Sequence, residues 1–126
     1  MPHVILDGEV KLERVVGRLS REAQRWDRTV FKNEASWLRA DGLAVLVEGV
    51  VIEHSRPLHP VAVISLKSGN TSVRLWRLAP VERTQAVQRW LASIAAELCR
   101  LEGRSLKTTN ITKELWNDLG MNARGS

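Results

Sequence analysis

Residues 29–78 constrain the fold most, because β-branched and aromatic side chains dominate this stretch and turn residues interrupt it. Asp41-Gly42 is the strongest hairpin signal, since both central positions of a type I′ turn need a positive φ angle. Gly69-Asn70 marks a second candidate hairpin, and a proline-containing stretch between the two marks a looser connection. The pattern therefore predicts a four-stranded antiparallel meander with strands over residues 29–40, 43–54, 60–67 and 71–78.

Two amphipathic segments flank the predicted sheet. Residues 9–26 carry apolar side chains at the three-and-four spacing of a helix, with Asp7 as the expected N-cap. A second helical stripe follows Pro80 and ends at Gly103, a residue typical of helix C-termini. Residues 111–119 predict a short last helix. The order predicts an α+β fold, a two-layer sandwich in which a four-stranded antiparallel meander is flanked by an N-terminal and a C-terminal helix.

Size and composition indicate a single domain over residues 1–126, because 44% hydrophobic and 26% charged residues are typical of a globular protein. Residues 120–126 are predicted to be a disordered tail. Cys99 is the only cysteine and no signal-peptide pattern is visible, so we expect a cytoplasmic location. The longest apolar run, residues 43–52, is too short to span a bilayer, so no membrane association is expected.

The predicted first hairpin has two contrasting faces. A two-residue turn places Trp37 opposite Leu46 and Phe31 opposite Ile52 on one large apolar face, which we expect the helices to cover. The other face should be polar if it meets water, yet it is only half polar. An apolar patch of this kind marks an interface or a ligand groove. The residues that we predict in an interface on this open face are Leu38, Val45, Val47, Val51, Val63 and Trp76.

A second copy of the chain, in a two-fold dimer, is the simplest cover for the open face. The alternative is that residues 104–119 or the strand-like residues 3–6 fold over it. The first expectation for function is therefore a non-enzymatic interaction module that homodimerises or binds a protein partner. Replacing Val47 or Val63 with Asp should then disrupt assembly without unfolding the chain.

The charge pattern supports an alternative function, nucleic-acid binding. The formal net charge is +5 and the pI is about 10.1, which favours a polyanionic partner, although mutational bias toward arginine would produce the same excess. Four arginines recur at four-three-four spacing along the first predicted helix, as a phosphate-tracking stripe would. Lys67, Arg74 and Trp76 share one sheet face. The nucleic-acid residues of this alternative are Arg14, Arg18, Arg21, Arg25, Lys67 and Arg74.

A second alternative is a small-ligand pocket or enzyme around Glu48. This carboxylate lies in mid-strand and the predicted register points it toward the core, where carboxylates acquire perturbed pKa values. The competing interpretation is a bulge at Glu48-Gly49 that turns the side chain outward. His54 and His59 flank the proline-containing connection, but two histidines make a weak metal signal. No phosphate-loop, dinucleotide, serine-hydrolase or zinc-protease motif occurs, so no cofactor or metal is expected.

Overall fold

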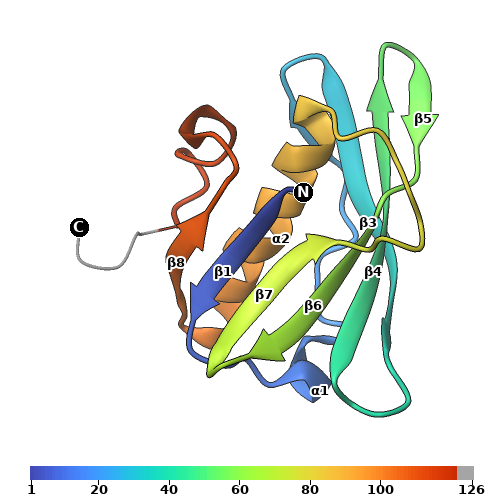
Figure 1. The fold of residues 1–126 in the computed structure, drawn as a ribbon. Helices are drawn as coiled ribbons and strands as arrows, with labels where there is room; N and C mark the ends of the chain where they lie inside the picture. The colour runs from blue at the N-terminus through green and yellow to red at the C-terminus, as the bar shows by residue number, and fades with distance from the viewer. Residues whose placement is uncertain (122–126) are drawn as a thin grey trace.

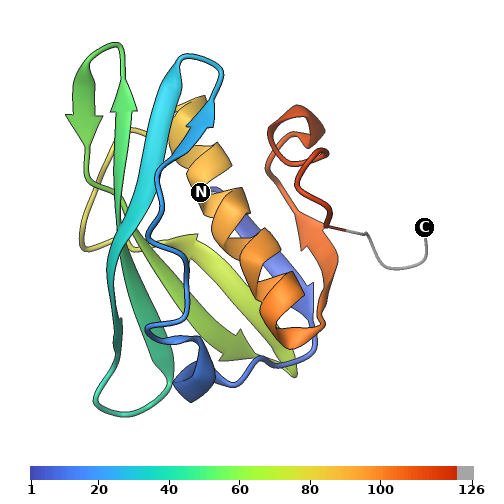
Figure 2. The ribbon, with the colours of Figure 1, turned by 180° about the vertical axis from the view of Figure 1, so that it is seen from behind.

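A curled antiparallel sheet of eight strands dominates the computed structural model, which describes residues 1–121 (Figure 1). The strands are β1 (His3–Asp7), β2 (Gln24–Trp26), β3 (Thr29–Leu38), β4 (Ala44–Glu53), β5 (Arg56–Leu58), β6 (Val61–Lys67), β7 (Asn70–Leu75) and β8 (Ser105–Thr109). Their order in the sheet is β2-β3-β4-β6-β7-β1-β8, and β5 pairs with β4. The sheet forms a half-barrel around one long helix, α2 (Gln85–Glu102), which Figure 2 shows from the helix side.

Three of the four long strands, β3, β4 and β6, lie within the predicted ranges, whereas β7 begins one residue earlier than predicted. The first turn gives the predicted pairing of Trp37 with Leu46, although Gly42 takes a positive φ angle and Asp41 does not. The β3–β4 turn uses Gly42 at φ +75°, while the Asp41 carboxylate accepts hydrogen bonds from the Arg39 side chain and from the backbone N–H of Leu43. The β6–β7 turn lies one residue earlier than predicted, since Ser68 and Gly69 take the two positive φ angles.

The predicted fold class is wrong at the N-terminal side, because residues 9–26 do not form a helix. Only α1 (Leu12–Val15) is helical, and β1 and β2 flank it in the chain. Gly8 and Gly17 adopt φ angles of +86° and +81°, which an α-helix cannot contain. Of the apolar residues that suggested a helix, Leu12, Val15 and Leu19 are buried, but in an irregular segment. The others are half-buried or exposed; they are Val16, Ala23 and Trp26.

The predicted short last helix over residues 111–119 is also wrong. Here β8 pairs with β1 and is followed by a single 3-10 turn, η1 (Lys113–Leu115). Thr109 donates from its hydroxyl to the carbonyl of His3 and accepts from the N–H of Ile111, so side-chain hydrogen bonds replace helical ones. Met121 is buried in the core, and residues 122–126 of the predicted tail lie outside the described residues. Two flanking helices on a four-stranded meander are therefore replaced by eight strands and one long helix.

The C-terminal helix and its end at Gly103 are confirmed as α2, but the helix begins at Gln85, so the predicted start at Pro80 is wrong. Both ends follow helix-capping chemistry. The Thr84 hydroxyl accepts from the N–H of Val87 at the N-terminus, and Gly103 ends the helix in the left-handed conformation. The helix packs in the hollow of the sheet with Trp90 against Gly49 of β4. A Cβ atom at Gly49 would lie 2.4 Å from the Trp90 ring, so this glycine provides the space in which the indole sits.

A bulge in β3 changes which side chains share a face. Trp37 opposes Leu46 as predicted, but the register shifts between Asn33 and Ser36, so that Phe31 opposes Val51 instead of Ile52. Phe31 is consequently 3% exposed in the core, whereas Trp37 is 49% exposed on the other side. In β4 the helix covers the face that was predicted to be open, because the turn fixes the strand pairing but not which face meets the helix. In β6 and β7 the predicted core side chains Ile64, Val73 and Leu75 are buried.

Candidate functional site

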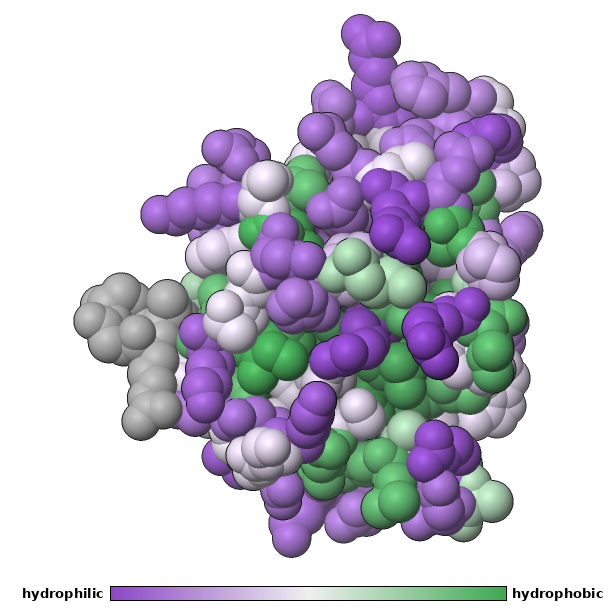
Figure 3. Space-filling model, in the orientation of Figure 1, coloured by the Kyte–Doolittle hydropathy of each residue, from purple (hydrophilic) through white to green (hydrophobic). Residues whose placement is uncertain are grey.

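The face of the sheet opposite α2, called the outer face from here on, carries the most distinctive surface of the molecule. A cross-strand row runs over β3, β4, β6 and β7, since Trp37 pairs with Leu46, Leu46 with Val63, and Val63 with Arg74. Figure 3 looks onto this side and shows apolar side chains interleaved with charged ones. The apolar side chains, called the outer patch, are Trp37, Leu46, Val50, Ile52, Val61, Val63 and Trp76.

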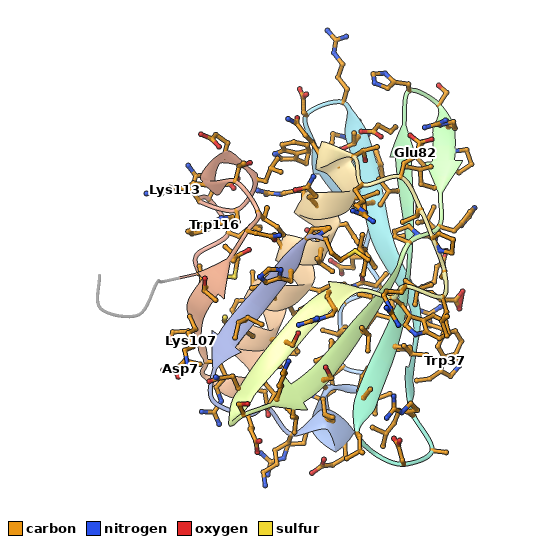
Figure 4. The ribbon with its side chains drawn as sticks, in the orientation of Figure 1. Asp7, Trp37, Glu82, Lys107, Lys113 and Trp116 are labelled. Atoms are coloured by element: carbon orange, nitrogen blue, oxygen red, sulfur yellow. The ribbon has the colours of Figure 1, made fainter. Side chains whose placement is uncertain are left out.

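The predicted interface residues divide between the two faces. Val63 and Trp76 lie half-buried on the outer face. Leu38 is exposed at the end of β3, but it pairs with the buried Val45, so it belongs to the helix side and not to the outer face. Val45, Val47 and Val51 are fully buried against the helix, so their assignment to an open face is wrong. The outer patch instead contains Trp37, which projects away from the ribbon in Figure 4. The signal that identifies the inner face of β4 is Gly49, because its alternation with Val47 and Val51 places all three under the helix.

Neither chain segment that was predicted as an alternative cover lies over the outer face. Residues 3–6 belong to β1, which pairs with β7, and residues 105–109 form β8, which pairs with β1, so both extend the sheet at its edge. The segment after β8 packs toward the helix side, where three of its side chains join the core; these are Ile111, Leu115 and Met121. Within residues 1–121, neither of these two segments therefore lies over the outer face of β3, β4, β6 and β7 (Figure 1).

Glu48 does not point into the core, contrary to the predicted register. It pairs with Val61 on the outer face, because its neighbours Val47 and Gly49 both face the helix. The bulge lies opposite it in β3 and not at Glu48-Gly49. Within residues 1–121, no hydrogen bond or salt bridge satisfies the Glu48 carboxylate, which is half-buried.

The predicted ligand pocket does not form. His54 follows Glu48 by six residues along an extended strand, a distance of roughly 20 Å. His54 and His59 are both exposed on either side of β5. Within residues 1–121, no three His, Cys, Asp or Glu side chains are grouped to hold a metal ion. Burial raises the pKa of the Cys99 thiol to about 11, so this thiol is a poor nucleophile at neutral pH.

The arginine stripe predicted along the first helix does not exist. Arg14 belongs to the single turn α1, Arg18 and Arg21 lie in the following loop, and Arg25 lies in β2. All four side chains are exposed, but no helix aligns them. The other basic group is placed as predicted, since Lys67, Arg74 and Trp76 all belong to the outer face. Arg74 is held on the sheet because its Nε donates to the Ser72 hydroxyl at 2.9 Å.

A buried polar cluster on the helix side escaped prediction. The Asn33 carbonyl oxygen accepts from the Trp90 indole N–H at 2.8 Å, and the Asn33 amide nitrogen donates to the carbonyl of Ser20 at 3.0 Å. The Glu97 carboxylate accepts from the N–H of Ser20, with its closer oxygen at 2.6 Å. Asn33 and Glu97 are each 8% exposed. This cluster ties the loop before β2 to α2 and β3, and its satisfied hydrogen bonds give it a structural role.

Comparison with known proteins finds no match, since no protein family, curated protein or solved structure is similar to the chain. Among residues 1–121, no helix has the length and apolar character needed to cross a membrane. The functional interpretation therefore depends on the geometry and chemistry of the outer face.

Proposed function

We propose that this protein is an interaction module that forms a homodimer through the outer face of its sheet. The observation that carries the proposal is the row of Trp37, Leu46 and Val63 across three neighbouring strands. Within residues 1–121, neither of the two segments that were predicted as alternative covers lies over this row. Half-exposed aromatic and aliphatic side chains grouped on one sheet face are typical of a protein interface.

Charge complementarity favours a second copy of the chain as the occupant. Glu48 on β4 pairs with Val61 and Arg74 on β7 pairs with Val63, so they flank β6 on either side. Two strand spacings and a two-residue offset along β6 place them about 12 Å apart. A two-fold axis lying between the two sheets exchanges these sides, so that each Glu48 meets Arg74 of the second copy. A two-fold interface must be self-complementary in this way, and the pairing would satisfy the carboxylate that has no partner in one chain.

A charge-reversal cycle tests this arrangement. Glu48→Arg and Arg74→Glu should each shift the protein toward monomer in sedimentation equilibrium, because each places like charges opposite one another. The double variant should recover the dimer, because it restores opposite charges at both contacts. Dimers in all three variants, or a wild-type protein that sediments as a monomer at high micromolar concentration, would contradict the proposal.

Two leucines at different places on the surface distinguish a specific interface from association through any exposed apolar side chain. Leu46→Glu removes a central side chain of the outer patch, whereas Leu43→Glu changes the same residue type at an exposed position in the β3–β4 turn. We expect dissociation for Leu46→Glu and unchanged mass for Leu43→Glu. Equal behaviour of the two variants would place the contact elsewhere.

A further inference from the structure

A hollow at the end of β7 has a composition different from that of the outer patch. It has a volume of about 260 Å³ and lies between the end of β7 and the loop that leads to α2. Leu75 and Val81 form apolar parts of its lining, and both also contact the core. Trp76 provides an aromatic wall, and Arg77 and Arg83 bring two guanidinium groups to the same hollow.

The charge of this hollow is not neutralised by its surroundings. No acidic residue lines it, and both of its arginines are exposed. Glu82 is adjacent in sequence to Arg83, but its carboxylate is 2.8 Å from the guanidinium of Arg56, so it is engaged with β5 (Figure 4). The two guanidinium groups are thus available for an anionic ligand, within a chain whose net charge is already +5.

We propose that this hollow binds a nucleotide unit, with the base against Trp76 and the phosphate on Arg77 and Arg83. Aromatic rings hold bases by stacking, and the planar guanidinium fork suits phosphate oxygens. The volume lies below the roughly 300–1,000 Å³ of sites that enclose whole small molecules, so it suits one base with its phosphate at the rim. The same chemistry is offered by a free nucleotide and by one unit of a single-stranded nucleic acid.

Fluorescence anisotropy of a labelled single-stranded oligonucleotide of about eight units, at about 50 mM and about 200 mM salt, tests the site. We expect binding at low salt that weakens at high salt. The Arg77→Glu/Arg83→Glu variant should weaken binding about tenfold or more, because two phosphate contacts become repulsive. The matched control is Arg18→Glu/Arg21→Glu, which makes the same charge change in an exposed loop and should alter affinity by less than about twofold.

Competition distinguishes the ligand's source and the role of the indole. AMP that displaces the oligonucleotide better than inorganic phosphate indicates that the base is recognised and that a free nucleotide suffices. Oligonucleotide binding without competition by AMP assigns the site to single strands. Trp76→Leu should then weaken binding about fivefold or more, the lower end of a lost stacking contact.

Two results would overturn the inference: no binding at low salt, or equal losses in the two double-arginine variants. The two proposals are tested by different variants, because Leu46→Glu targets the dimer and Arg77→Glu/Arg83→Glu should leave the mass unchanged. Trp76 belongs to both surfaces, so Trp76→Leu is compared with wild-type Trp76 in the Leu46→Glu background.

Discussion

The two faces of strand β4 have similar sequences but different environments. Its inner side chains, Val45, Val47 and Val51, are fully buried under α2, whereas Leu46 and Val50 on the outer side are only half-buried. Hydrophobicity does not distinguish these sets, since both consist of aliphatic residues. What distinguishes the two sets is how well they fit against the helix. The inner face includes Gly49, which leaves space for the Trp90 ring, whereas the outer face includes the Glu48 carboxylate. In a sheet that is apolar on both sides, steric fit decides which side becomes the core.

The largest effect should come from placing a charge on the inner face. Val47→Asp should lower the free energy of unfolding by about 3–5 kcal/mol, because an unpaired carboxylate would be buried under α2. This replaces the expectation from the sequence that the same change would spare the fold. Urea denaturation followed by circular dichroism measures the loss. A variant as stable as the wild type would show that Val47 is not in the core.

Gly49→Ala should be the next most damaging change. The added Cβ would lie within 2.7 Å of three atoms of the Trp90 ring, so the indole or the strand must move. We expect a loss of about 3 kcal/mol, at the upper end of typical overpacking costs. Thermal denaturation provides the measurement, and Gly42→Ala is a control in which strain arises from the positive φ angle alone. An unchanged melting temperature for Gly49→Ala would contradict the close packing of Trp90.

Two adjacent polar residues in the β3 bulge also allow the inner and outer faces of the sheet to be compared. Asn33 faces inward and Glu34 faces outward, where its carboxylate lies 3.4 Å from the Lys32 ammonium. Asn33→Ala should cost about 1–3 kcal/mol, because it leaves the buried indole N–H of Trp90 without an acceptor. Glu34→Ala should cost less than about 1 kcal/mol, since exposed ion pairs contribute little. Equal unfolding free energies for the two variants would disprove the bulge geometry.

The smallest expected effect concerns the C-terminal segment and pH. The Arg89 guanidinium donates to the Asp118 carboxylate and lowers the pKa of that carboxyl below its usual range. Because the folded pKa lies below the unfolded one, the ion pair contributes stability above about pH 4 and loses it as the pH falls further. Asp118 is mostly exposed, so solvent screens the contribution. Asp118→Asn should flatten the acid side of the stability profile slightly; an identical profile would show that the pair adds nothing.

The fold was predictable where one chemical signal acted alone. Turn glycines located the meander, and Gly103 ends a helix whose stripe has no competing interpretation, although the helix begins after Thr84 and not at Pro80. The N-terminal region was not predictable, because Leu12 and Val15 fit a helical stripe equally well whether the chain continues as a helix or turns at Gly17. Sequence periodicity records which residues are buried, but it does not record which element buries them.

The candidate site was partly predictable for the same reason. Val63 and Trp76 were assigned to the open face because the second hairpin alternates regularly. Trp37 was assigned to the core, because nothing in the sequence marks the bulge that puts it on the opposite face from Phe31. The hollow beside Trp76 was missed, because Arg77 and Arg83 lie in an irregular loop whose path only the structure shows.

The central claim is that the inner face of the sheet stabilises the fold and that the outer face forms the dimer interface. Sedimentation velocity and far-ultraviolet circular dichroism of the Val63→Asp variant test this claim most directly. The account predicts a wild-type dimer and a Val63→Asp protein that is monomeric with an unchanged circular dichroism spectrum. A Val63→Asp protein that remains dimeric, or one that loses its sheet signal, would contradict the division of roles between the two faces.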